Sequence, residues 1–172
     1  MNKNFVTYLV NFILFVVLQV FVLNKICLWE CITPMVYILF ILSLPFKMPQ
    51  WAVISVGFLL GMIMDFFTGV IGYHALATLV IAFVRPVIIR VISYREEREE
   101  HLHPIFYDMR FIWYLQYVFW LTFIHHFVYF FVDVLSFHNF LRTIIVILSN
   151  TVCSLLCIFI IQILFYKSSK RY

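Results

Sequence analysis

Long runs of apolar residues dominate this sequence and limit the folds that are open to it. Five of them reach the roughly 20 residues that a helix needs to cross the hydrocarbon core of a membrane: residues 5–23, 51–71, 75–92, 111–135 and 140–166. Of all residues, 65% are hydrophobic and only 12% are charged, which is too few charges to cover a soluble domain. The sequence therefore predicts an integral membrane protein.

The spanning segments are expected to be helices, because a segment in lipid must satisfy its own backbone hydrogen bonds. Unbroken apolar runs also differ from the alternating pattern of barrel strands. A sixth run, residues 32–44, has a length that would suit a re-entrant segment. We interpret it as a short span with Pro34 in its first helical turn. The predicted fold class is all-α: residues 1–172 form a single transmembrane domain with a bundle of about six helices.

Basic residues are distributed unequally between the two sides of this bundle. Alternate assignment of the loops places two of them, Lys25 and Arg142, on one side and nine on the other: Lys3, Lys47, Arg90, Arg95, Arg98, Arg110, Lys167, Lys170 and Arg171. The side richer in Lys and Arg is expected to be cytoplasmic. Both termini and the loop 93–110 are then cytoplasmic, and the net charge of +4 requires no nucleic acid as a partner.

The loop 93–110 is the one sizeable polar segment of the sequence. Its simplest interpretation is a solvated connector that prolongs the preceding helix. Contact with a cytoplasmic partner is the alternative, and Arg95, Arg98 and Arg110 are the candidate residues for that contact.

The third span contains a stripe of small residues. All four glycines lie in or just after this span, and Gly57, Gly61 and Gly69 are separated by multiples of four residues, so they share one helix face. Glycine lowers helix stability but allows another helix to approach closely. Together with Gly72, the stripe is predicted to be a helix-packing surface, within the bundle or against a transmembrane partner.

A carboxylate, Asp65, interrupts this stripe inside the membrane, where it must be neutral, paired or close to water. Counting along the helices places Gln19 and His125 at nearly the same height. With His126 and Tyr129, these residues are expected to form a polar layer in the outer half of the bundle. An internal hydrogen-bond network is the simpler interpretation, and a small-ligand pocket or proton relay is the alternative.

No catalytic site and no metal site is predicted. The sequence contains no nucleophile elbow, P-loop, HExxH motif or pair of carboxylates within one span. His125, Tyr129 and Asp133 have the spacing of a metal-binding face, but a third strong ligand has no obvious source. We therefore expect no enzyme activity and no cofactor.

Two further features have mainly structural interpretations. Arg85 lies close enough to the inner boundary for its side chain to extend to the cytoplasm, and a salt bridge within the bundle is the alternative. The pairs Cys27–Cys31 and Cys153–Cys157 have helical spacing and are interpreted as small packing residues. Two thiolates on one face for a metal are the alternative, and Cys27 and Cys31 could form a disulfide if their loop is not helical and faces an oxidising compartment.

The order of these features resembles the MreD family of bacterial rod-shape-determining proteins. The resemblance covers the whole chain in topology but rests in motif on about 25 residues. Pro34 stands at the start of the second span, as in the family. The glycine-rich third span with a central Asp and a Gly-x-His exit is matched by Gly57, Gly61, Asp65, Gly69, Gly72, His74 and Ala75.

This resemblance implies a non-enzymatic component of the cell-elongation machinery in the bacterial inner membrane, needed for rod shape and lateral peptidoglycan synthesis. The implied partners are an MreC-like single-span protein, a RodA-type glycosyltransferase, a class B penicillin-binding transpeptidase, MreB directly or indirectly, and membrane lipids. The implied fold is similar to the substrate-binding subunits of energy-coupling-factor vitamin transporters. A vitamin-like small-molecule-binding subunit of a transporter is therefore the alternative function.

Overall fold

The computed structural model describes residues 3–26, 32–92, 104–134 and 140–165. These residues form helices and no strand, which confirms the all-α class. The long helices are α1 (Lys3–Val17), α3 (Gln50–Thr68), α4 (Tyr73–Ile92), α6 (Phe111–Val134) and α7 (Phe140–Phe165). Helix α1 continues through a π-helical turn, η1 (Leu18–Val22), and a 3-10 turn, η2 (Leu23–Lys25). Five helices are thus long and apolar enough to cross a membrane, and the protein is a multi-pass membrane protein.

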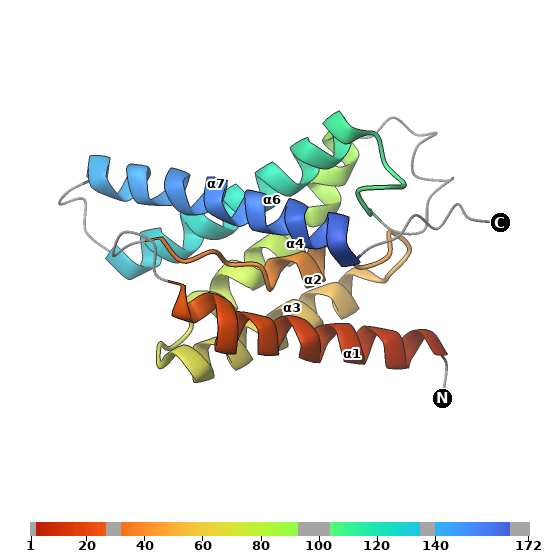
Figure 1. Ribbon diagram of the computed structural model, residues 1–172, viewed down its shortest axis with the longest axis horizontal. Helices are drawn as coiled ribbons and strands as arrows, with labels where there is room; N and C mark the ends of the chain where they lie inside the picture. The colour runs from red at the N-terminus through yellow and green to blue at the C-terminus, as the bar shows by residue number, and fades with distance from the viewer. Residues whose placement is uncertain (1–2, 27–31, 93–103, 135–139, 166–172) are drawn as a thin grey trace.

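The long helices run back and forth along one axis of the molecule (Figure 1). The start of α1, the connection that enters α3 and the end of α7 lie at the same end of the bundle as the end of α4 and the start of α6. The turn between α3 and α4 lies at the opposite end, together with η2 and the start of α7. The helices α3, α4, α6 and α7 pack on one another in that order.

The second apolar run is not the helical span that we predicted. Its helix, α2, covers only Ile38–Leu42, and residues 32–36 have no helical structure. Figure 1 shows this segment running between α1 and α7 towards the start of α3. Every residue from 34 to 42 is buried. We call residues 32–44 the buried segment, because it crosses the interior of the bundle instead of facing lipid.

Length explains why the buried segment is mostly not helical. Thirteen residues in an α-helix would extend about 20 Å, which is well short of the roughly 30 Å of a hydrocarbon core. A more extended backbone advances by up to about 3.3 Å per residue. Leaving the first half of the segment non-helical therefore lets it cover the distance between the end of α1 and the start of α3. Pro34, placed in a helical turn by our prediction, precedes the helix instead.

Two of the four glycines lie where α3 meets α4. A Cβ on Gly57 would lie 3.0 Å from the Cβ of Ala82. A Cβ on Gly61 would lie 2.4 Å from the Cα of Ala75 and 2.6 Å from the carbonyl oxygen of His74, so it would collide with backbone atoms. This face of α3 is therefore occupied by α4 and packs within the bundle.

The other two glycines are turn residues, and our prediction that they belong to the packing stripe is wrong. Gly69 ends α3 in the left-handed conformation, with φ of 74°, and Gly72 has φ of 87°. No atom lies within 4 Å of the Cβ that either would carry. They are glycines because side chains disfavour positive φ, and they let the chain reverse between α3 and α4.

Several predicted features lie partly outside the described residues. Arg95, Arg98, Cys27 and Cys31 belong to the ranges that the structure does not describe. Arg110 is exposed, and its carbonyl oxygen accepts a hydrogen bond from the backbone of α6.

We predict that Gly61→Leu destabilises the protein, because the new side chain would have to displace the backbone of α4. The expected cost is about 3 kcal/mol, the upper part of the range for overpacked cores. Leu59→Ala is the control on the same helix. Leu59 is 54% exposed, so shortening its side chain should change the stability of the protein little. The melting temperature in detergent and the level of protein in the membrane measure the effect of each variant. Equal melting temperatures for Gly61→Leu and wild type would show that α3 and α4 are not in such close contact.

Candidate functional site

A glutamine on the first span binds the backbone of the buried segment. Gln19 lies in η1 and is 1% exposed. Its Oε1 accepts hydrogen bonds from the N–H groups of Val36 (2.7 Å) and Tyr37 (3.2 Å). Its Nε2 donates to the carbonyl oxygen of Pro34 (2.9 Å) and to the Oδ1 of Asn24 (2.8 Å). One amide thus replaces several of the bonds that a helix would have supplied.

Helix α7 supplies the remaining partners on the other side of the segment. Asn150 Oδ1 accepts from the N–H of Thr33 and Ser154 Oγ from the N–H of Met35, both at 2.9 Å. The two side chains are four residues apart and therefore share one face of α7. In lipid each unpaired backbone group costs several kcal/mol, so these bonds are what make a non-helical crossing possible.

The hydroxyl of Ser154 extends this network to α6. It lies 3.2 Å from Nε2 of His126, whose Nδ1 lies 2.8 Å from the carbonyl oxygen of Thr122. A carbonyl can only accept, so His126 carries its proton on Nδ1 and accepts from Ser154 through Nε2. His126 therefore belongs to the scaffold of the buried segment.

A buried arginine holds the other end of the segment. Arg85 on α4 is 3% exposed, and its Nε donates to the hydroxyl of Tyr117 at 2.8 Å. Its guanidinium also donates to the carbonyl oxygen of Leu44, while Tyr117 donates to that of Leu42 at 2.9 Å. The side chain therefore points into the bundle, and our prediction that it extends to the cytoplasm is wrong. A cation at the carbonyl end of α2 is favourable for the same reason as at any helix C-terminus.

Tyr37 stands at the centre of the polar layer. Its hydroxyl lies 2.8 Å from Nδ1 of His74 and 2.8 Å from Nε2 of His125. The ring of Tyr129 packs against the ring of His74, with 4.6 Å between their centroids. The two histidines come from α4 and α6, so the buried segment joins these helices to Gln19 and α7.

Asp65 has a different role from the one we predicted. It is 4% exposed, and its Oδ1 accepts from the N–H of His74 (2.8 Å) while its Oδ2 accepts from those of Gly72 and Ala75 (both 3.0 Å). These are the free N–H groups at the start of α4, where a negative charge is stabilised by the helix dipole. The carboxylate thus caps the next helix and makes no described hydrogen bond to Gln19 or His125.

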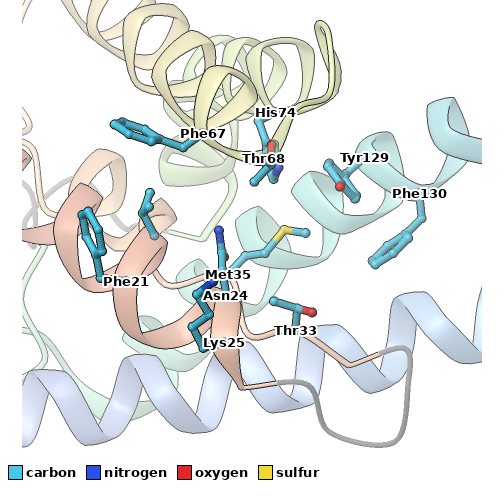
Figure 2. A pocket seen from close by; sticks show the side chains of 11 residues that line it. Phe21, Asn24, Lys25, Thr33, Met35, Phe67, Thr68, His74, Tyr129 and Phe130 are labelled. Carbon is cyan, nitrogen blue, oxygen red and sulfur yellow. The ribbon is translucent and has the colours of Figure 1, made fainter.

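A pocket of about 470 Å³ opens beside this network (Figure 2). Phe67 and Thr68 border it from the end of α3 and His74 from the start of α4, while Tyr129 and Phe130 border it from α6. The remaining lining residues belong to η1, η2 and the buried segment: Val20, Phe21, Asn24, Lys25, Thr33 and Met35. Its volume lies within the range of small-molecule sites.

The structure thus gives the predicted polar residues three different roles. Gln19, His125 and His126 serve the buried segment, Tyr129 packs on His74, and Asp65 caps α4. Residues that we did not assign to the site are Tyr37, Ser154 and Tyr117. The spacing of Asn150 and Ser154 was the available signal, because two small polar residues four apart on an apolar helix favour one polar contact.

The polar side chains around the buried segment are largely engaged in hydrogen bonds within the fold. The buried hydroxyl of Ser154 is engaged with a backbone N–H and a histidine that is itself fixed by a carbonyl. Among the described residues, no group of three His, Cys, Asp or Glu side chains could hold a metal ion. Cys153 and Cys157 on α7 are half-buried free thiols.

We predict a graded loss of stability at Asp65. Asp65→Asn retains one acceptor oxygen but turns an NH2 group towards N–H donors, so it should cost about 1–2 kcal/mol. Asp65→Leu leaves two buried N–H groups and the partly buried N–H of Gly72 unpaired, and it should cost about 3 kcal/mol or more. Thermal unfolding in detergent measures the order of stability of the wild type and the two variants. Stability that is equal in the three proteins would contradict the capping role.

Comparison with known proteins does not identify a family for this chain. No family model, no curated protein and no solved structure matches the chain. The function is therefore argued from the features of the sequence and from the arrangement of its residues in the fold.

Proposed function

We propose that this protein is a non-enzymatic scaffold of the bacterial cell-elongation machinery, which acts by binding partner membrane proteins in the inner membrane. The direct partner in this proposal is an MreC-like protein with a single span. The RodA-type glycosyltransferase, the class B penicillin-binding transpeptidase and MreB are recruited directly or through that partner. The proposal rests on the MreD-like features of the sequence and on one surface of the structure.

The residues that carry the resemblance are connected in the structure, which supports treating them as one unit. Asp65 accepts a hydrogen bond from the backbone of His74, and the side chain of His74 contacts Tyr37 in the buried segment. The carbonyl oxygen of Pro34, three residues earlier, accepts from Gln19. Residues far apart in sequence thus depend on one another, as expected of a motif that defines a fold.

The observation that carries the scaffold function is a groove beside α1. It has a volume of about 790 Å³ and is lined almost entirely by apolar residues: Val10, Ile13, Leu14, Phe15, Val17, Leu18 and Val22 from the first span, with Ile161 from α7. One polar residue, Asn11, also lines it and is half-buried. The Asn11 amide has no hydrogen bond to any described residue.

An unpaired amide in an apolar groove is well suited to a second transmembrane helix. Asparagine side chains in lipid form hydrogen bonds between helices, typically about 1 kcal/mol each. The two spans beside this groove are also the least covered in the bundle. Their spanning windows are 22% and 28% buried, against 33–39% for the others. A single-span partner would cover both helices and pair with Asn11.

Several helix ends lie at the same end of the bundle, which supports the proposed orientation with both termini in the cytoplasm. The start of α1 and the end of α7 lie on one side of the bundle, together with the connection that enters α3 and the end of α4 (Figure 1). That connection contains Lys47, and the last turn of α4 contains Arg90. With the nine-to-two distribution of basic residues, this side faces the cytoplasm in our proposal.

We predict that filling the groove separates the protein from its partner without unfolding it. Leu14→Trp places a large ring in the groove, and Asn11→Leu removes the amide. Each should lower recovery of an MreC-like protein several-fold in affinity purification from native membranes, while the melting temperature stays near wild type.

Leu9→Trp is the matched control, since Leu9 and Leu14 lie on the same helix and are 47% and 46% exposed, but Leu9 does not line the groove. Equal recovery with Leu9→Trp and Leu14→Trp would argue against the groove as the interface. Recovery of an ATPase complex and a stoichiometric vitamin in place of cell-elongation proteins would favour the transporter alternative.

A further inference from the structure

The first span lines the groove with branched and aromatic side chains and one amide. Between Phe5 and Val22 the chain contains no glycine, alanine or serine. Small residues of these kinds are what let two membrane helices bring their backbones close together in a right-handed crossing. A helix bound in this groove must therefore pack by interlocking bulky side chains, which keeps the two helix axes about 8–10 Å apart.

The lining residues also have the spacing of a left-handed helix pair. Val10, Leu14 and Val17 follow one another at steps of four and three residues, and Asn11, Leu14 and Leu18 at steps of three and four. Alternating steps of three and four are the pattern that two helices crossing at about +20° present to each other. Val10, Leu14 and Val17 are each about half exposed, so their side chains extend into the space that a second helix would fill.

The groove is long enough for a helix that crosses the membrane. Its lining on the first span begins at Val10 and ends at Val22, about 18 Å away along the helix. This length is more than half of the roughly 30 Å hydrocarbon core. Ile161 lines the groove from α7, about one turn before the end of that helix at Phe165. A helix lying in the groove therefore contacts both the first and the last span.

Asn11 fixes the position of this contact along the helix. It lies in the second turn of the span Val6–Lys25, about 8 Å from the first residue. Its amide makes no hydrogen bond to a described residue. An amide has two donors and an acceptor, and neither acyl chains nor apolar side chains offer them a partner in lipid. The matching group on a bound helix must therefore lie at the same depth and be able to donate and accept.

We propose that the occupant of this groove is a single apolar helix of bulky side chains that carries one amide or hydroxyl side chain opposite Asn11 and crosses the first span in a left-handed pair. One polar residue in an otherwise apolar helix contact sets the register of the two helices. The apolar rows supply contact area, and the pair at Asn11 selects the partner. This inference rests on the proposed scaffold function and specifies the chemistry of the helix that the scaffold binds.

Synthetic transmembrane peptides test this inference without knowledge of the natural partner. The first probe is a 20-residue polyleucine helix with lysines at both ends and one asparagine at its sixth residue, which matches the depth of Asn11. The second probe has leucine at that position, and the third has its asparagine at residue ten. Fluorescence anisotropy of each labelled peptide, titrated with the full chain in detergent, measures affinity. The first peptide should bind about fivefold more tightly than the other two, the effect of one interhelical hydrogen bond.

Variants of the chain complete the comparison. Asn11→Leu should weaken binding of the first peptide about fivefold and leave binding of the all-leucine peptide unchanged. Leu14→Trp should weaken binding of all three peptides several-fold, whereas Leu9→Trp, outside the groove, should change none. Equal affinity of the three peptides for the wild type, or an equal effect of Asn11→Leu on all of them, would overturn the inference.

The outcomes also separate this inference from the proposed function. A wild-type chain that is dimeric in detergent and becomes monomeric with Leu14→Trp would show that a second copy fills the groove, which would overturn the inference. Peptides that discriminate at Asn11, without recovery of cell-elongation proteins from native membranes, would support the inference and contradict the proposed function. Recovery of those proteins that is lost with Leu14→Trp, while the peptides bind equally, would support the function and overturn the inference.

Discussion

The backbone of the buried segment must be satisfied inside a membrane, and the rest of the structure is arranged around this requirement. A helix would meet it internally, but residues 32–36 are not helical. Gln19 supplies bonds from one side, and Asn150 and Ser154 supply them from the other. Each unpaired backbone group in lipid would cost several kcal/mol. The first and last spans are thereby tied to the same central strip of chain.

The helix pair α3–α4 completes the enclosure by a separate set of contacts. Gly61 lets the two helices approach, and Asp65 pairs the free N–H groups where α4 begins. Arg85 on α4 then binds the carbonyl end of the buried segment. These polar groups are fully used in holding the fold. Asn11, whose amide makes no hydrogen bond to a described residue, is the polar group that we assign to binding another protein.

Much of the fold could be predicted from the sequence, because apolar runs of spanning length have one good solution in lipid. The five long helices begin and end within a few residues of the predicted spans. The path of the buried segment could not be predicted from the sequence, because its composition suits a short helix. Its hydrogen-bond partners also lie up to 119 residues away along the chain. The direction of the Arg85 side chain was predicted wrongly, because its depth in the membrane allows the guanidinium to point either into the bundle or to the cytoplasm. The partners of Asp65 were missed because backbone donors have no sequence signature.

Hydrogen–deuterium exchange in lipid nanodiscs tests most directly that the buried segment is held by side chains. The N–H groups of Val36 and Tyr37 lie outside a regular helix, yet both residues are 0% exposed and bonded to Gln19. Peptides covering residues 33–37 should therefore exchange as slowly as the long helices. Gln19→Leu should speed this exchange, whereas Asn11→Leu on the same span should leave it slow. Rapid exchange of these residues in the wild-type protein would contradict the account.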